Sequence, residues 1–294
     1  MEQVIPERFA IGKRWKRLGA MLVLLPVLCY GVYRAYEAYQ ESFGVEVLFP
    51  PYHVGPPHDD DTLRVCIIGD SWAEYHASLS CDTIFQLYAN KLGAQPVLCT
   101  SRGHGGKMTK EIYRDMFADR TVEHAWEKDY CTQPLLEQHP DYCVVMAGIN
   151  DLCWQRPVNY YIGNYRRILQ LLLDNDIRPV VMEVPAIDVE SSDKDRGFYK
   201  YVYIRLVSLF SDAGWNEVDA YRQAMRNMLK DQSLVDKVLF IPASWWNEGG
   251  VDGSPEIYLD DRLHLNMHGY HVLDSCIVSE IIKDNERIKR RIRK

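Results

Sequence analysis

The chain has 294 residues, of which 47% are hydrophobic and 26% are charged, a composition typical of a globular protein. Its 34 basic and 41 acidic side chains give a formal net charge of −7, which argues against bulk binding of nucleic acid. This length accommodates one large domain with an extension, or two small domains.

The amino-terminal region combines a basic cluster, KRWKR at residues 13–17, with an uncharged apolar run from Leu18 to Tyr33. The run is slightly shorter than the ~20 residues of a membrane span, and it contains Pro26. A signal anchor, a cleaved signal peptide and a buried core helix all fit this pattern. We favour an uncleaved transmembrane anchor within residues 1–40, which leaves the basic flank in the cytoplasm and the remainder on the extracytoplasmic side.

A proline-rich stretch, FPPYHVGPPHDDD, follows at residues 49–61. Its four prolines and three consecutive aspartates predict a stiff polar linker over residues 41–62, with the domain boundary near Asp61. We therefore expect one domain over residues 63–285 and a basic tail over residues 286–294.

Within this domain, short apolar runs alternate with longer stretches of helical periodicity. The runs show no polar alternation, as expected of parallel strands that are covered on both faces. Residues 159–175 repeat apolar side chains at three- and four-residue intervals, which indicates a helix. The alternation predicts a doubly wound α/β domain. The expected strands are 64–69, 95–100, 141–148, 178–184 and 237–242.

The eight cysteines do not identify a cellular compartment. Cys66 and Cys143 lie in expected strands, where cysteine behaves as a small hydrophobic residue. Four other cysteines are available for disulfides in an exported domain, although the sequence does not give their pairing. These four are Cys81, Cys99, Cys131 and Cys153.

Unusual polar clusters follow the first three strands, and another precedes the last helix. Taken singly, each has a simple structural explanation as a turn or a helix cap. Ligands of open α/β sheets, however, bind beyond the carboxyl ends of the strands, where these clusters are expected. The clusters are GDSW (69–72), SRGHGG (101–106), GIND (148–151) and DRLH (261–264).

In this order and at these places, the four clusters resemble the sequence blocks of the SGNH hydrolases, also called the GDSL esterase and lipase family. The resemblance covers about residues 63–285. It implies a three-layer α/β/α sandwich around a five-stranded parallel sheet of flavodoxin-like type. Two positions depart from the family pattern: Trp72 stands where the short name has leucine, and Ser101 where the second block often has asparagine.

The residue types at these positions predict a serine nucleophile with its partners. Ser71 needs a base to take its proton, and His264 is the candidate because imidazole titrates near neutral pH. Asp261 would hold the tautomer of that ring and stabilise the imidazolium. The resemblance implies an oxyanion hole made by the backbone N–H groups of Ser71 and Gly106 and the side chain of Asn150. Asp70 and Asp151 are expected to tie loops together.

A zinc site on the last helix is the alternative use of this region. His264, His268 and His271 have suitable spacing, but His264 is expected to precede the helix and no H-E-x-x-H motif is present. We therefore expect no metal and no cofactor.

The loop ASWWNEGG (243–250) contains two adjacent tryptophans, Trp245 and Trp246. They either form a sugar-stacking wall beside the serine or fill the core beneath the loop.

The combined interpretation is a membrane-anchored serine esterase that acts through an acyl-enzyme on an ester, namely an O-acyl group on a cell-surface glycan. No nucleic acid is expected as a partner. An O-acyltransferase that uses the same acyl-enzyme is the first alternative, because the attacking group is not part of the chain. A non-catalytic glycan-binding or scaffold protein on the same fold is the second.

Overall fold

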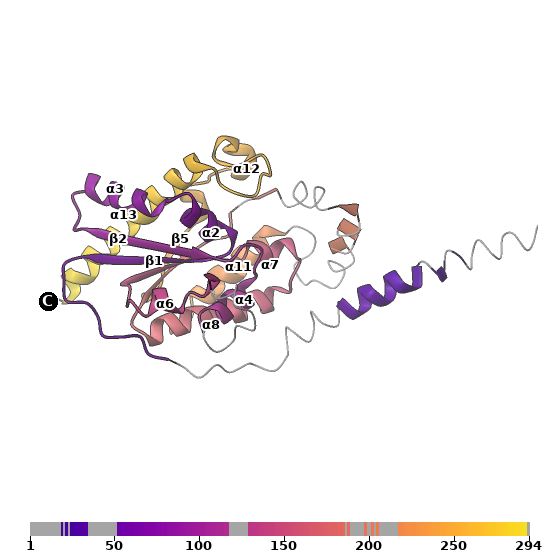
Figure 1. Cartoon of the computed structure of the whole chain (residues 1–294), viewed down its shortest axis with the longest axis horizontal. Helices are drawn as coiled ribbons and strands as arrows, with labels where there is room; N and C mark the ends of the chain where they lie inside the picture. The colour runs from indigo at the N-terminus through magenta and orange to yellow at the C-terminus, as the bar shows by residue number, and fades with distance from the viewer. Residues whose placement is uncertain are drawn as a thin grey trace, which may run out of the picture.

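The computed structural model contains a sheet of five parallel strands in the order β2-β1-β3-β4-β5 (Figure 1). It describes residues 19, 21–22, 24–34, 52–117, 129–185, 187–188, 197–198, 201–202, 204–205 and 217–292. The strands are β1 (Leu63–Gly69), β2 (Val97–Gly103), β3 (Tyr142–Met146), β4 (Arg178–Met182) and β5 (Leu239–Ile241).

Every expected strand is present, and the predicted α/β class with a five-stranded parallel sheet is confirmed. All five residues of β3 are buried, which explains a continuous apolar run without polar alternation. Strand β5 lies at the edge of the sheet and is only partly buried.

Helices cover both faces of the sheet (Figure 1). Helices α3 and α13 pack together on one face, while α8 packs against both α4 and α11 on the other. The helix expected at residues 159–175 is α8, and its buried residues recur at helical spacing. The bounds of these helices are α3 (Asp82–Lys91), α4 (Thr109–Asp115), α8 (Val158–Asp174), α11 (Val218–Leu229) and α13 (Met267–Ile292).

Short helices occupy the connections that follow the strands. Helix α2 (Ser71–Ser78) follows β1, and α7 (Ile149–Cys153) follows β3. The others are α6 (Gln133–Leu136), η2 (Ala243–Trp245), α12 (Gly250–Gly253) and η3 (Pro255–Ile257).

Strand β2 extends beyond its expected end at residue 100, through Gly103. Gly103 pairs in register with Gly69 of β1, and a Cβ atom at Gly103 would lie only 2.1 Å from the backbone nitrogen of Glu74. Glycine is therefore required where β2 passes the start of α2. The polar residues Ser101 and Arg102 belong to the strand rather than to the loop that the sequence suggested.

The folded unit begins earlier than the expected boundary at Asp61. The Tyr52 ring packs edge-on against Phe117 with a centroid separation of 5.4 Å. The backbone N–H of Val54 donates to Asn175 Oδ1 at 2.8 Å. Residues 52–62, the described part of the predicted linker, are therefore attached to the domain, because these contacts replace hydration of an otherwise extended chain.

The end of α13 is fixed at the amino ends of the strands. Asp284 accepts hydrogen bonds from Arg178 Nε at 2.5 Å and from the Tyr142 hydroxyl at 3.0 Å, and these two residues begin β4 and β3. Burial acts to raise the pKa of Asp284, but the hydrogen bonds from Arg178 and Arg287 outweigh it and lower the pKa.

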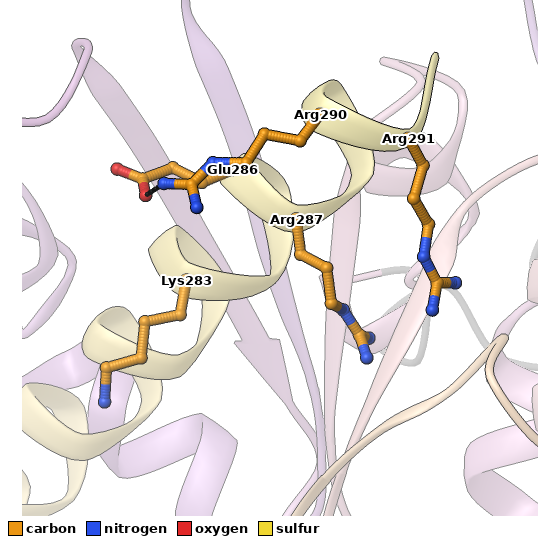
Figure 2. A pocket seen from close by; sticks show the side chains of 5 residues that line it. All are labelled: Lys283, Glu286, Arg287, Arg290 and Arg291. Carbon is orange, nitrogen blue, oxygen red and sulfur yellow. Dashed lines mark hydrogen bonds and ion pairs between the residues drawn. The ribbon is translucent and has the colours of Figure 1, made fainter. Parts of the chain in front are cut away.

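Residues 286–292 of the predicted basic tail continue this helix, since α13 runs to Ile292, and residues 293–294 lie outside the described residues. A hollow of about 360 Å³ lies along its last turns, and Arg290 forms an ion pair across one side with Glu286 at 3.2 Å (Figure 2). The hollow is lined by Lys283, Glu286, Arg287, Arg290 and Arg291.

Residues 24–34 form a helix with many exposed apolar side chains, among them Leu24, Leu25 and Leu28. In the described part of the chain, no helix combines the length and the apolar character that crossing a bilayer requires. Much of the predicted anchor, including residues 1–18 and 35–40, lies outside the described residues.

All eight cysteines are described, and none of them forms a disulfide. The disulfides that the sequence allowed for Cys81, Cys99, Cys131 and Cys153 are therefore not formed. Each of these four is buried, and burial is a common setting for cysteine as a small apolar residue.

Candidate active site

Ser71 is placed at the carboxyl edge of the sheet by the abrupt end of β1. A Cβ atom at Gly69 would lie 1.9 Å from the carbonyl oxygen of Met146, so only glycine allows β1 and β3 to approach this closely. Asp70 then caps α2, accepting from the backbone N–H of Trp72 at 3.0 Å. Ser71 is the first residue of that helix and is partly exposed.

His264 and Asp261 reach Ser71 from a loop 190 residues further along the chain. His264 Nε2 lies 2.8 Å from Ser71 Oγ, and His264 Nδ1 lies 2.5 Å from Asp261 Oδ2. A carboxylate beside Nδ1 favours the tautomer with its proton on that nitrogen. Nε2 then has a free lone pair, which accepts a hydrogen bond from the Ser71 hydroxyl.

The backbone around Asp261 holds its carboxylate toward the ring. Asp261 Oδ1 accepts from the N–H groups of Leu263 at 3.0 Å and of His264 at 2.9 Å. Partial burial acts to raise the pKa of Asp261, but the hydrogen bonds from the side chain and backbone of His264 and from Leu263 outweigh it and lower the pKa. Asp261 is therefore ionised throughout the neutral range, as an acceptor for Nδ1–H must be.

The loop after β2 and the start of α7 meet beside Ser71. The Asn150 side chain donates from Nδ2 to the carbonyl oxygen of Lys107 at 3.0 Å, which joins the third sequence block to the residue after Gly106. Gly106 itself is exposed. Gly105 faces the serine more directly, since a Cβ atom there would lie 3.8 Å from Ser71 Cβ.

Asp70 and Asp151 are fully buried and tie loops together, as expected from the sequence. Asp151 accepts from the backbone N–H of Thr109 at 3.0 Å and from its hydroxyl at 2.7 Å, which anchors the start of α4. Burial raises the pKa of Asp70 to about 7 and that of Asp151 to about 6.

Trp72 connects the two halves of this site, a role that the sequence reading missed. Its indole N–H donates to the Leu263 carbonyl at 3.2 Å, and its own carbonyl accepts from the Tyr270 hydroxyl at 2.7 Å. Since Trp72 follows Ser71 and Leu263 precedes His264, these bonds set the separation of serine and histidine. The sequence signal that could have pointed to this role is the tryptophan at position 72, where the family's short name has leucine.

Tyr75 is a second residue that the sequence reading missed. Its ring lies against the His264 ring with a centroid separation of 4.7 Å and an interplanar angle of 37°. This contact restricts the orientation of the imidazole beside Ser71. Tyr75 stands four residues after Ser71 on α2, a spacing that places both on one face of the helix.

The two tryptophans of the 243–250 loop have different surroundings. Trp246 is 6% exposed and its ring packs edge-on against Trp72 with a centroid separation of 5.9 Å. Trp245 is 54% exposed. The core explanation therefore holds for Trp246, and Trp245 alone is available to a ligand.

The histidines considered as a zinc site are not on one helix. Helix α13 begins at Met267, so His264 precedes it. The two ring nitrogens of His264 face Ser71 and Asp261 and are not directed toward His268 or His271. His271 lies near the Tyr88 hydroxyl, 3.4 Å from Nδ1.

A narrow apolar crevice lies at the carboxyl ends of β3 and β4, next to the residue that follows Ser71. Its volume is about 10 Å³, which is room for about one water molecule. By contrast, the basic hollow on α13 lies at the opposite edge of the sheet. The crevice is lined by Trp72, Met146, Ala147, Ile149, Met182, Glu183, Val184 and Pro185.

A parallel sheet of this strand order, with serine, histidine and aspartate in hydrogen-bond contact at its carboxyl edge, defines an α/β serine hydrolase that acts on esters. The GDSL-like Lipase/Acylhydrolase family matches residues 67–272, and the chain belongs to this family. The predicted family membership is thereby confirmed. No curated protein matches the chain by sequence.

Several solved structures share the fold at low sequence identity. A putative acylhydrolase from Bacteroides fragilis NCTC 9343 is 15% identical with a TM-score of 0.51, covering 84% of this chain and 94% of its own. The esterase EstA from Pseudoalteromonas sp. is 14% identical with a TM-score of 0.50, covering 76% and 98%. The acetyl xylan esterase AlAXEase is 17% identical with a TM-score of 0.50, covering 75% and 100%.

Proposed function

We propose that Ser71, His264 and Asp261 form the catalytic triad of this esterase. The contact that carries the proposal is the 2.8 Å hydrogen bond between Ser71 Oγ and His264 Nε2. As Oγ attacks the ester carbonyl carbon, its proton moves to Nε2, and Asp261 stabilises the resulting imidazolium. The imidazolium then protonates the departing alcohol, which leaves an acyl group on Ser71. Water, activated by the same ring, releases the acid.

The oxyanion of each tetrahedral intermediate requires donors that are already in position. The proposed donors are the backbone N–H of Ser71, the backbone N–H of Gly106 and the Asn150 side chain. Ser71 opens α2, so its N–H is one of the four without an acceptor inside the helix. Asn150 Nδ2 lies beside the loop that contains Gly106, as its bond to Lys107 shows.

The proposed substrate is a short O-acyl group on a glycan, with acetyl as the best fit. We assign the acyl group to the crevice beside Trp72, the residue after Ser71, and the small volume of this crevice favours acetyl over longer acyl chains. The exposed indole of Trp245 offers a flat apolar surface of the kind on which sugar rings stack. A structural relative, AlAXEase, is an acetyl xylan esterase.

Replacing Trp245 by alanine tests this substrate class. On acetylated xylan, KM should rise by roughly tenfold with kcat nearly unchanged, because stacking binds ground state and transition state alike. On an aryl acetate without a sugar, the variant should match the wild type, which serves as the internal control. Acetate release is measured for both, together with acetyl transfer to added unacetylated xylan, which would reveal a transferase. If the variant has the kinetics of the wild type on both substrates, Trp245 is not part of the binding site, and the triad proposal is unaffected.

We further propose that the apolar run Leu18 to Tyr33 anchors the protein in a membrane, with the hydrolase domain on the extracytoplasmic side. The support is the sequence of basic and apolar residues, and the exposure of Leu24, Leu25 and Leu28 on a helix. Several exposed leucines on one helix are unfavourable in contact with water and favourable in contact with lipid.

Deleting residues 1–51 should convert the protein from the membrane fraction to a soluble enzyme with the wild-type rate on aryl acetates. Cutting instead after residue 60 removes the contacts of Tyr52 and Val54 and should lower the Tm by several degrees. Fractionation, melting curves and rates are compared for the full chain and both truncations. The anchor is excluded if the full-length chain remains soluble without detergent while the shorter chain aggregates.

A further inference from the structure

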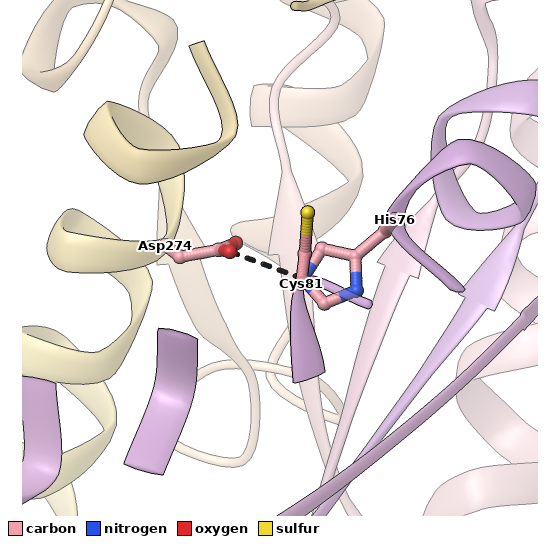
Figure 3. A group of neighbouring side chains, drawn as sticks. All are labelled: His76, Cys81 and Asp274. Atoms are coloured by element: carbon pink, nitrogen blue, oxygen red, sulfur yellow. Dashed lines mark hydrogen bonds and ion pairs between the residues drawn. The ribbon is translucent and has the colours of Figure 1, made fainter. Parts of the chain in front are cut away.

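A buried cluster of His76, Cys81 and Asp274 lies away from the candidate active site. It joins α2, the residue that precedes α3, and the first third of α13 (Figure 3). All three side chains are fully buried. One potential ligand atom from each lies within 4.8 Å of the other two, and no other such group was found among the described residues. Figure 3 shows the Asp274 carboxylate directed toward the His76 ring, with the Cys81 side chain beside them.

The surroundings of His76 fix its ring in the orientation of a metal ligand. Nε2 faces Asp274 Oδ2 at 3.1 Å, inside the cluster. Nδ1 faces Ser101 Oγ at 2.9 Å and Asp82 Oδ1 at 3.2 Å, outside it. A histidine that binds a metal through one nitrogen usually donates its other N–H to a carboxylate, and Asp82 is placed for this role. The rings of Phe85 and Tyr270 pack edge-on against His76.

Asp274 retains an oxygen that nothing in the described part of the chain satisfies. Its Oδ1 is buried and has no hydrogen-bond partner. A buried polar atom without a partner costs about 1–3 kcal/mol, and more if the group is charged. A cation between Asp274 and Cys81 would satisfy this oxygen.

We propose that His76, Cys81 and Asp274 bind a structural zinc ion. Nitrogen, sulfur and carboxylate oxygen together match zinc, whereas magnesium and calcium prefer oxygen ligands alone. Two ligands of one zinc ion lie about 3–4 Å apart given bonds of ~2.0–2.3 Å. The ligand atoms of this cluster lie within 4.8 Å of one another, so small side-chain shifts would bring all three to one ion. The second oxygen of Asp274 can complete four-fold coordination. A thiolate and a carboxylate balance the two positive charges, and the proton of the Cys81 thiol is released to solvent.

The ion would connect three elements that are distant in sequence, and α2 among them carries Ser71. It takes no part in the ester chemistry, since His76 and Ser71 stand on different turns of α2. This inference does not rest on the proposed substrate or on the proposed anchor. It differs from the sequence expectation, which excluded metal on the basis of His264, His268 and His271.

The test is made on the full chain, purified in detergent without chelators from zinc-containing medium. About one zinc per chain is expected by elemental analysis. After exchange with cobalt, a thiolate-to-cobalt absorption band should appear in the near ultraviolet. Saturating zinc should raise the Tm of the stripped protein by roughly 10 °C if free zinc exceeds Kd by about 1,000-fold. Zinc at background level and no cobalt–thiolate band would overturn the proposal, and His76 and Asp274 would then be a buried ion pair.

Three variants separate ligands from structural residues. Cys81→Ala should abolish the cobalt–thiolate band and weaken zinc binding by ~100-fold or more, and Asp82→Asn should weaken it by ~10- to 100-fold. Cys143→Ala is the matched control, because Cys143 is also a fully buried free thiol but lies in β3. It should retain both the zinc and the band. If the control loses zinc as completely as Cys81→Ala, the cluster is not the site.

Discussion

Replacing Ser71 by alanine should reduce the hydrolysis of aryl acetates by roughly 10⁴- to 10⁶-fold, the usual consequence of removing a serine nucleophile. Without Oγ no acyl-enzyme forms, and only the weak effect of binding and oxyanion stabilisation remains. The Tm should stay close to that of the wild type, because Ser71 is partly exposed and the substitution removes a single hydroxyl, which hydrogen-bonds to His264. A fluorophosphonate probe should label the wild type and leave the variant unlabelled.

Ser78→Ala is the matched control. Ser78 stands at the other end of α2, is exposed, and donates a hydrogen bond to the carbonyl oxygen of Tyr75. Its replacement should leave both labelling and rate unchanged. If Ser71→Ala retains more than a trace of activity, or is still labelled, the nucleophile is another residue and the triad proposal fails.

Asn150→Ala is expected to lower kcat by roughly 10²- to 10³-fold, the typical effect of losing one oxyanion donor. KM should change little, since the donor is needed where negative charge develops and much less in the bound ester. Steady-state kinetics on an aryl acetate separate the two parameters. A variant that changes only KM would assign Asn150 to substrate binding.

This substitution also removes the bond from Asn150 to Lys107, so a structural effect must be distinguished from a chemical one. Asn164→Ala serves this purpose. Asn164 is buried to the same degree and donates to the Tyr160 carbonyl at 2.9 Å inside α8. It should lose stability by about 1 kcal/mol with kcat intact. A comparable loss of kcat in both variants would make the Asn150 effect a matter of folding.

The sequence determined the fold class and the family because both depend on local patterns. Runs such as β3 are apolar at every position, since both faces of a parallel sheet are covered. The alternation of these runs with helices then indicates a doubly wound α/β domain. The residue types after the strands gave the candidate site residues, because parallel strands bring their carboxyl ends to one edge. Their catalytic roles stay predictions until the variants are measured.

Only the tertiary structure decided which side chains meet across long separations. Trp72 bonds the carbonyl of the residue before His264, and His76 faces Asp274, and the partners are 191 and 198 positions apart in the sequence. Neither pair leaves a periodic signal, because each contact depends on how a loop or helix packs rather than on its own sequence.

The adjacent residues Trp245 and Trp246 show that even the burial of neighbouring side chains is decided by the tertiary structure. Hydrophobicity is equal for the two, yet one is exposed and the other fills the core beside Trp72. Likewise, residues 52–62 carry the composition of a free linker but are attached to the domain. In both cases the backbone path decides burial, and that path is fixed by packing against distant parts of the chain.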